Sequence, residues 1–328
     1  MPAHSTQWWQ RHQIGVYLAA VLCGAVTATA APSGGRVLEN IITPLLAALL
    51  YTTFVQVPAR QLAHSLRNKR FLTAALGINF ILVPLVVAGI WRFLPHDDAI
   101  RIGVLLVLLT PCIDYVVAFT QLAGGASHIL LAATPLLLLT QMLLLPAFLW
   151  LFMGPQLATT IDAVPFVNAF VMLIVIPLTL AWATQAATAR HAGGQRIIGM
   201  CEAAAVPLMA ATLTVVVASQ TPKLDGATRL IGTVAPAFFV FLAAMAVIGW
   251  VTARLFRFDT ATGRALIFTG ATRNSLVVLP LALAIPEHLA AAAVVVVTQT
   301  LVEIIGMIAY IGLVPVVLPT PSATRTLR

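Results

Sequence analysis

Charged residues are scarce in this sequence of 328 residues. Only 9% of the residues are charged and 60% are hydrophobic, whereas a typical soluble domain has about 25% charged residues. The composition excludes a soluble globular protein and indicates a polytopic membrane protein embedded in a lipid bilayer. The net charge of +8 does not indicate binding to nucleic acid. The basic residues lie in short segments between apolar runs, where they orient membrane spans.

The sequence also lacks the patterns of a metal site, a disulfide framework or a catalytic centre. Its three cysteines, Cys23, Cys112 and Cys201, each lie inside an apolar run without metal-ligand spacing. No Gly-rich phosphate loop, HExxH motif or Ser-His-Asp order is present, and no soluble segment is long enough to fold alone. We therefore predict no cofactor, no resident metal and no enzymatic activity.

Long apolar runs dominate what is present. With about 20 residues per crossing, ten runs can be delimited, namely 14–31, 37–57, 70–94, 100–123, 128–154, 163–185, 197–219, 228–254, 264–286 and 289–318. In a ten-span arrangement, twelve Lys and Arg residues fall on one side and five on the other, with Arg273 on neither. This bias predicts a multi-pass protein of the cell (inner) membrane with both termini in the cytoplasm.

The first run leaves two interpretations open. Arg11, the apolar stretch after it and Thr29-Ala30-Ala31 have the order of a cleavable signal peptide. The same features suit a retained first span whose N-terminus is cytoplasmic. Spans two to ten keep the same orientation in either case, so the other predictions do not depend on this choice.

Two runs contain residues that a continuous membrane helix does not tolerate. The run 100–123 contains Thr110-Pro111-Cys112-Ile113-Asp114-Tyr115. Proline removes a helix hydrogen bond, and an ionised Asp at the bilayer centre costs about 2.5 to 3.5 kcal/mol. The run 264–286 contains Thr272-Arg273-Asn274-Ser275. We predict that both helices are broken at these points and that the breaks form the halves of one site.

The two breaks fall at equivalent places in the two halves of the chain, in spans four and nine. Similar polar residues flank them, namely Ser127-His128 with Thr140-Gln141 and Glu287-His288 with Thr298-Gln299. Because each half has five spans, the halves are oppositely oriented. We predict one all-α transmembrane transporter domain over residues 1–328, with ten transmembrane helices in an inverted 5+5 repeat (about 14–154 and 163–318). Its broken helices 4 and 9 would cross at the midplane, as is typical of secondary transporters.

The breaks hold the first candidate functional residues. Cys112 is either a small buried hydrophobic residue or a thiol that unwound backbone activates as a soft ligand. Asp114 and Arg273, one in each break, either form a structural ion pair or face a substrate or a coupling proton. These two interpretations of the charged residues are compatible.

The last run adds a carboxylate. Glu303 lies in the middle of an apolar run, where a carboxylate is by default a proton or ion site. The alternative role is a partner for Arg273 or for a neighbouring hydroxyl. Neutral hydrogen bonds near the crossing would come from amides and a hydroxyl. The predicted substrate-binding residues are Cys112, Asp114, Asn274 and Ser275, and the predicted proton- or ion-coupling residues are Glu303, Asp114, Arg273 and Gln299.

These residues resemble a known family. Ten spans with breaks in spans four and nine resemble the bile acid:sodium symporter superfamily. Within it, Thr110-Pro111-Cys112, Leu301-Val302-Glu303 and Ala271-Thr272-Arg273-Asn274-Ser275 resemble the arsenical-resistance branch, the arsenite permeases. The resemblance implies a panel of spans 1, 2, 6 and 7 and a core of spans 3–5 and 8–10. It also implies that Cys112 and Glu303 act in the efflux of arsenite or antimonite in exchange for protons.

The chemistry leaves a choice of substrate. Soft As(III) prefers sulfur, so Cys112 would bind it transiently while Glu303, together with Asp114, carries the proton. The alternative is a sodium- or proton-coupled symporter of an organic anion. Arg273 weakens sodium coupling, because a guanidinium repels the ion, but it could attract a carboxylate substrate. An intramembrane enzyme or a passive channel fits less well, because no catalytic pair or ring of like charges is present.

Overall fold

The computed structural model describes residues 12–30, 35–55, 68–112, 115–154, 168, 171–188, 194–221, 227–283, 285 and 287–319. The chain divides into two compact units. Unit 1 comprises Met1–Ala59, Ala158–Gly232 and Leu276–Val297, and unit 2 comprises Arg60–Leu157, Thr233–Ser275 and Thr298–Arg328. The panel and core expected from the sequence stay a prediction.

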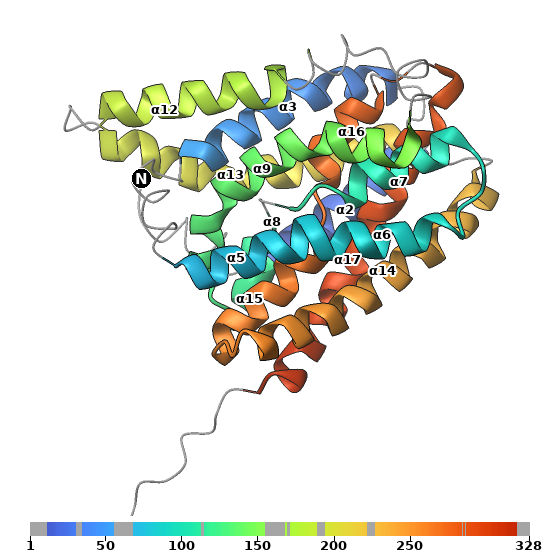
Figure 1. The fold of residues 1–328 in the computed structure, drawn as a ribbon. Coiled ribbons are helices and arrows are strands. Elements are labelled where there is room, and N and C mark those ends of the chain that lie inside the picture. The colour runs from blue at the N-terminus through green and yellow to red at the C-terminus, as the bar shows by residue number, and fades with distance from the viewer. Residues whose placement is uncertain are drawn as a thin grey trace, which may run out of the picture. The chain divides into compact units, whose positions relative to one another are not determined.

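Helices make up nearly all of the described structure (Figure 1). The α-helices are α2 (Gln13–Ala30), α3 (Gly35–Val55), α5 (Lys69–Gly77), α6 (Val83–Trp91), α7 (Asp98–Leu108), α8 (Tyr115–Leu122), α9 (Ser127–Met153), α12 (Ile176–Thr188), α13 (Gly194–Gln220), α14 (Thr228–Leu255), α15 (Thr260–Ala271), α16 (Ser275–Leu283) and α17 (Ala291–Val317). Two π-helical turns, η2 (Ile78–Leu82) and η3 (Val171–Val175), and the 3-10 helix η5 (Glu287–Leu289) complete them.

Six helices in the described part of the chain are long and apolar enough to cross a membrane. They are Val37–Val55, Lys69–Trp91, Leu136–Met153, Arg196–Gln220, Thr228–Leu255 and Ala291–Val317. Gly15–Ala30 is a shorter apolar helix. The predicted runs 100–123 and 264–286 form interrupted helices, and the run 163–185 begins outside the described residues. The prediction of an all-helical polytopic membrane protein is confirmed, while the ten-span inverted repeat stays a prediction.

Unit 1 is organised by α13, which packs against α2 and α3, while α12 packs against α3. A Cβ atom at Gly24 of α2 would lie 2.7 Å from the carbonyl oxygen of Thr214. Only glycine therefore permits this approach of the two helices. At the end of α3, the Gln185 side-chain amide donates to the carbonyls of Phe54 (3.0 Å) and Val55 (3.1 Å). Unit 1 thus combines small-residue packing with a polar cap on a helix end.

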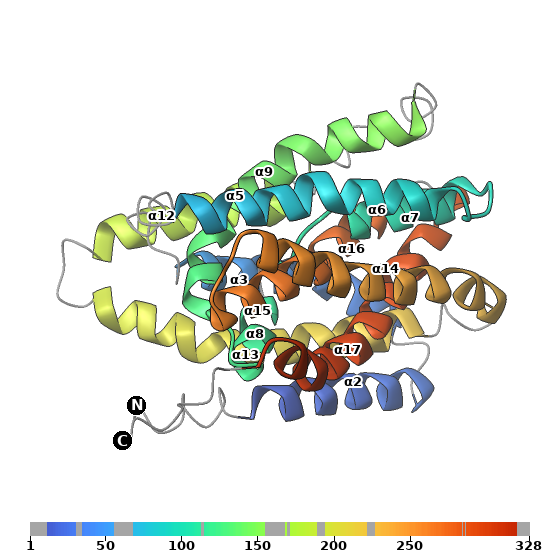
Figure 2. The same ribbon diagram turned by 60° about the horizontal axis from the view of Figure 1, so that its bottom comes forward.

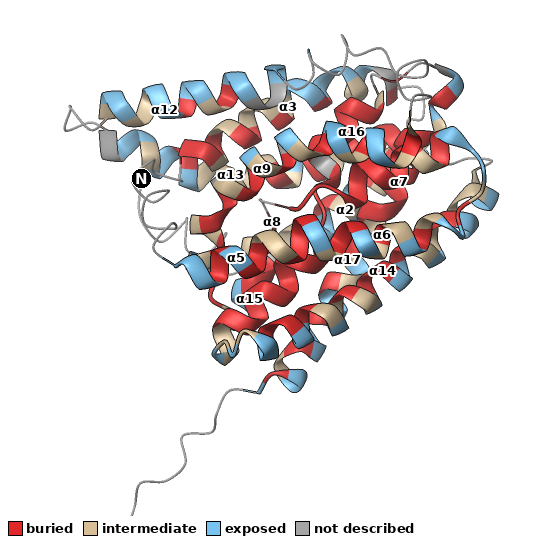
Figure 3. Ribbon diagram, in the orientation of Figure 1, coloured by how far each residue is buried: buried red, intermediate tan, exposed pale blue. Residues whose placement is uncertain are grey.

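The centre of unit 2 is α15, in which every residue from Thr262 to Ala271 is buried (Figure 3). Helices α5, α8 and α9 pack against it (Figure 2). Asp259 caps its start, because its carboxylate accepts hydrogen bonds from Thr262 N (2.9 Å) and Thr262 Oγ1 (2.7 Å). Burial raises the pKa of Asp259, but the hydrogen bonds from Thr262 outweigh it and hold the pKa below the ordinary value.

Arg264 joins the ends of three helices in unit 2. The side chain is buried at the start of α15. Its guanidinium donates to the carbonyl of Leu318, just after α17 (2.7 Å), and to that of Ala123, just after α8 (2.8 Å). Carbonyls at helix C-termini have no partner within the helix and carry partial negative charge. The arginine therefore fixes the ends of α8 and α17 against α15.

Candidate functional site

Both predicted interruptions are present, and their extended segments pair in unit 2. One segment separates α7 from α8 and the other separates α15 from α16. An isolated antiparallel β-bridge joins them. Its hydrogen bonds run from Cys112 N to Thr272 O (3.0 Å) and from Asn274 N to Thr110 O (2.8 Å). Each break thus supplies one backbone donor and one backbone acceptor to the other, and backbone groups freed from a helix in a membrane need such partners.

Local sequence explains where α7 and α15 end. Pro111 has no N–H to continue α7. The hydroxyl of Thr110, just before it, donates to Leu106 O at 2.8 Å. Thr272 repeats this contact at the end of α15, where its hydroxyl donates to Phe268 O at 2.7 Å. A threonine hydroxyl bonded to the carbonyl four residues earlier closes the last turn of each helix before the chain becomes extended.

The guanidinium of Arg273 binds the ends of both helices. Its Nη1 donates to Leu108 O (3.2 Å), at the end of α7. Its Nη2 donates to Thr269 O (2.7 Å) and Gly270 O (2.8 Å), in the last turn of α15. A fourth acceptor is the side-chain oxygen Oδ1 of Asn79 (2.7 Å). The arginine is fully buried, with an exposed fraction of 0%. Three backbone carbonyls at helix C-termini, which carry partial negative charge, and one amide oxygen accept hydrogen bonds from its guanidinium.

Glu303 of α17 provides the matching negative charge. Its carboxylate accepts hydrogen bonds from the Tyr115 hydroxyl (2.6 Å), the backbone N–H of Arg273 (2.8 Å) and the side-chain amide of Gln299. The contact with Arg273 therefore runs through the backbone N–H, while the guanidinium goes to carbonyls and Asn79. Bonds to an ionised acceptor are about twice as strong as neutral ones, so this carboxylate ties α8 and α17 to the second break.

The structure brings six of the seven predicted site residues into unit 2. We call the two paired extended segments the crossing. Five of the six residues are buried at or beside it, namely Cys112, Arg273, Asn274, Gln299 and Glu303, and Ser275 begins α16 there. The seventh, Asp114, lies outside the described residues. Its predicted pairing with Arg273 therefore stays a prediction, as do the functional roles of the other six.

Sequence reasoning missed two residues that hold the site together, Asn79 and Tyr115. Asn79 is fully buried in η2, and its Nδ2 donates to Ala75 O (2.9 Å) and Thr269 Oγ1 (3.3 Å). A signal was available, because Asn79 is the only amide side chain in the apolar run 70–94. Its place in a π-helical turn is also typical of functional positions. Tyr115 directly follows the Asp114 of the first motif.

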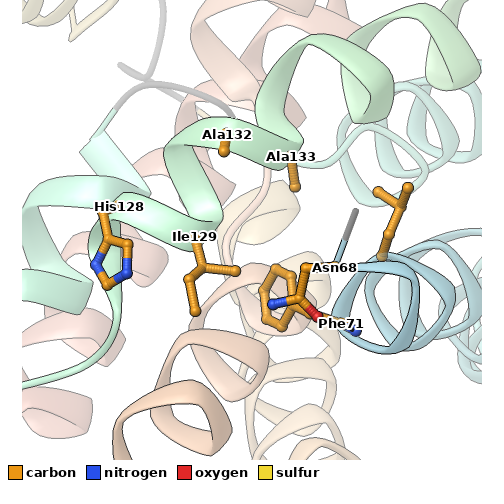
Figure 4. Close-up of a pocket in the computed structure, with 7 residues that line it drawn as sticks. Asn68, Phe71, His128, Ile129, Ala132 and Ala133 are labelled. Atoms are coloured by element: carbon orange, nitrogen blue, oxygen red, sulfur yellow. Dashed lines mark hydrogen bonds between the residues drawn. The ribbon is translucent and has the colours of Figure 1, made fainter. Parts of the chain in front are cut away.

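A pocket in unit 2 lies away from the crossing (Figure 4). It has a volume of about 210 Å³ and lies between the starts of α5 and α9. Its lining residues are Asn68, Phe71, Leu72, His128, Ile129, Ala132 and Ala133. None of the described residues at the crossing lines it, so this pocket is not part of the candidate site.

A comparison with family models finds a match to more than half of the chain. The model of the Sodium Bile acid symporter family matches residues 43–226, just over half of the chain. The matched range includes the first break with Cys112, and it ends before Arg273 and Glu303. No curated protein matches the chain in a sequence comparison.

Proposed function

Since the chain belongs to the sodium bile acid symporter family, we propose that it is a secondary active transporter that carries an organic anion across the membrane. The family match over residues 43–226 is the observation that carries this proposal. Two helices broken at paired extended segments suit such a carrier, because discontinuous helices form the substrate and ion sites of secondary transporters. Exchange of backbone partners at the breaks would accompany alternating access.

The driving force in this proposal is a cation gradient. Co-transport of one cation neutralises a monovalent anion, so the anion no longer moves against the membrane potential, which is worth about 2.3 kcal/mol per charge per 100 mV. Sodium and the proton are the two candidates. A coupling proton would bind to Glu303, whose buried carboxylate accepts three hydrogen bonds.

A second candidate function is the efflux of arsenite or antimonite in exchange for protons. Its specific support is the thiol of Cys112, which lies buried in the extended segment of the first break. A single thiol can bind soft As(III) and release it again. In this proposal Asn274 and Ser275 hold the hydroxyls of the metalloid, and Glu303 and Asp114 carry the exchanged proton.

Transport by the purified chain in proteoliposomes tests the first proposal. Taurocholate serves as the bile-acid probe, under an inward sodium gradient, an inward proton gradient or no gradient. We expect accumulation above the equilibrium level with at least one gradient and none without. The first proposal would be overturned, and the second supported, if the vesicles transport arsenite but show no gradient-driven accumulation of taurocholate or of other organic carboxylates.

Cys112→Ser separates the two substrates, with Cys201→Ser as its control because Cys201 is also buried. If the substrate is an organic anion, both variants keep taurocholate uptake near the wild-type rate. If it is arsenite, Cys112→Ser abolishes the arsenite resistance that the chain gives to an arsenite-sensitive deletion strain, and Cys201→Ser keeps it. Undiminished resistance in the Cys112→Ser strain would rule out the thiol mechanism.

A further inference from the structure

The breaks after α7 and after α15 leave carbonyl oxygens without their helical partners, and three of these carbonyls surround one side chain. In a continuous α-helix the carbonyl of residue i accepts the N–H of residue i+4. Leu108 O, Thr269 O and Gly270 O would thus accept from residues 112, 273 and 274. All three carbonyls instead accept from the guanidinium of Arg273, at 2.7 to 3.2 Å.

The N–H groups that would have filled these positions all donate elsewhere. Cys112 N donates to Thr272 O, Arg273 N to Glu303 Oε2 and Asn274 N to Thr110 O. The crossing of the two breaks therefore does two things at once. It pairs the backbone N–H groups across the extended segments, and it leaves a set of buried carbonyls that needs a donor or a positive charge.

The resulting cage has the character of a cation site. Three oxygens, Asn79 Oδ1, Thr269 O and Gly270 O, converge on one nitrogen, Nη2 of Arg273, at 2.7 to 2.8 Å. Carbonyl and amide oxygens are the ligands of hard cations, and rings of carbonyls replace the hydration shell of alkali ions in channels. Half-helix C-termini and unwound carbonyls coordinate the coupling ion in secondary transporters.

We propose that Arg273 is a built-in cation, whose guanidinium permanently occupies a cage that would otherwise bind a monovalent alkali ion. A mobile sodium ion therefore does not enter this cage during transport, and the coupling cation uses other groups. Glu303, bonded to the backbone N–H of the same residue, balances the fixed charge. The proposal concerns the coupling ion and therefore rests on the proposed transport function. Its test measures ion binding and does not require transport.

Removal of the guanidinium without a replacement charge is the decisive change. The full-length chain and its Arg273→Ala and Arg273→Lys variants are purified in detergent, and the melting temperature is measured in NaCl, KCl and choline chloride at equal ionic strength. We expect Arg273→Ala to melt below the wild type in choline and to gain a saturable stabilisation by Na⁺ or K⁺ that exceeds any wild-type response. Binding to the folded state alone produces such a rise with ion concentration.

Two variants make the result specific. Arg273→Lys keeps a tethered cation and should respond to the salts as the wild type does. Arg264→Ala removes another buried arginine that donates to carbonyls, those of Leu318 and Ala123. It should lower the melting temperature equally in all three salts, because Gly124 beside that site is exposed and water can replace the guanidinium.

The proposal is overturned if Arg273→Ala melts alike in the three salts, or fails to fold in all of them. Folding of Arg273→Ala in NaCl or KCl but not in choline chloride would support it. Failure of the transport experiments would leave this ion response unchanged, so the two proposals can fail separately.

Discussion

At the scale of single residues, the crossing is a buried polar network in which the charged groups of Arg273 and Glu303 each have several hydrogen-bond partners. Arg273, Glu303 and Asn79 all have exposed fractions of 0%. A buried charge left without a partner costs several kcal/mol, and hydrogen bonds to a charge are electrostatically stronger in a low-dielectric interior than in water. Loss of one donor should therefore cost more here than at an ordinary buried hydroxyl.

Tyr115→Phe tests this expectation against Tyr310→Phe. Both tyrosines are buried, and each has one hydrogen bond of 2.6 Å, from Tyr115 to the carboxylate of Glu303 and from Tyr310 to the carbonyl of Leu242. The Tyr115 hydroxyl also makes a longer contact of 3.1 Å with the carbonyl of Arg273. We expect Tyr115→Phe to lower the free energy of unfolding by about 1.5 to 3 kcal/mol and Tyr310→Phe by about 0.5 to 1.5 kcal/mol, because bonds to charged groups are stronger.

Denaturant unfolding in detergent micelles measures both variants under the same conditions. Equal losses for the two tyrosines would show that the charge of Glu303 does not strengthen the bond from Tyr115. A larger loss for Tyr310→Phe would contradict the network description altogether.

At the scale of elements, close packing of α15 in unit 2 depends on glycine in its neighbour α14. A Cβ atom at Gly249 would lie 2.9 Å from the Cα atom of Ile267 in α15. Backbone cannot swing aside as the end of a side chain can, so an added methyl group would push the two helices apart. Because α15 ends at the crossing, such a shift would also move the carbonyls that hold Arg273.

Gly249→Ala should therefore destabilise the protein, and Gly232→Ala, in the same helix, should not. Overpacking typically costs about 1 to 3 kcal/mol. A Cβ atom at Gly232 meets nothing within 4 Å, so the better helix propensity of alanine should add about 0.5 to 1 kcal/mol. Melting temperatures of the two variants decide the matter, and a neutral Gly249→Ala would mean that α14 and α15 are less tightly packed than described.

The breaks themselves could be predicted at this scale, and their neighbours could not. Proline and charged residues in apolar runs mark the places where α7 and α15 end, because both features are costly in a membrane helix. The π-helical turn η2 has no such marker. It forms where Asn79 reaches α15, and that contact depends on a helix nearly two hundred residues further along the chain.

At the scale of the whole molecule, the sequence predicts an orientation in the membrane. Basic residues favour one side of the ten predicted spans, and short basic loops remain in the cytoplasm. The termini lie outside the described residues, so fusion reporters provide the test. We expect a green fluorescent protein fused after Arg328 to fluoresce and alkaline phosphatase fused there to be inactive.

Alkaline phosphatase inserted after Pro95, in the loop between α6 and α7, serves as the opposite control and should be active. Active phosphatase at both positions would contradict an even number of spans. Active phosphatase only after Arg328 would mean that the orientation is inverted.

The sequence by itself determined the class of this protein and indicated several of the residues that meet at the two breaks. Low charge and long apolar runs require a membrane, and Cys112, Arg273 and Glu303 are conspicuous because each is costly or unusual in an apolar run. The tertiary structure alone decided what these residues contact. Arg273 was expected to pair with a carboxylate or a substrate, yet its guanidinium goes to Asn79 and to three backbone carbonyls. Every residue has a carbonyl, so a sequence cannot indicate which ones lose their helical partners; only the crossing of two broken helices does so.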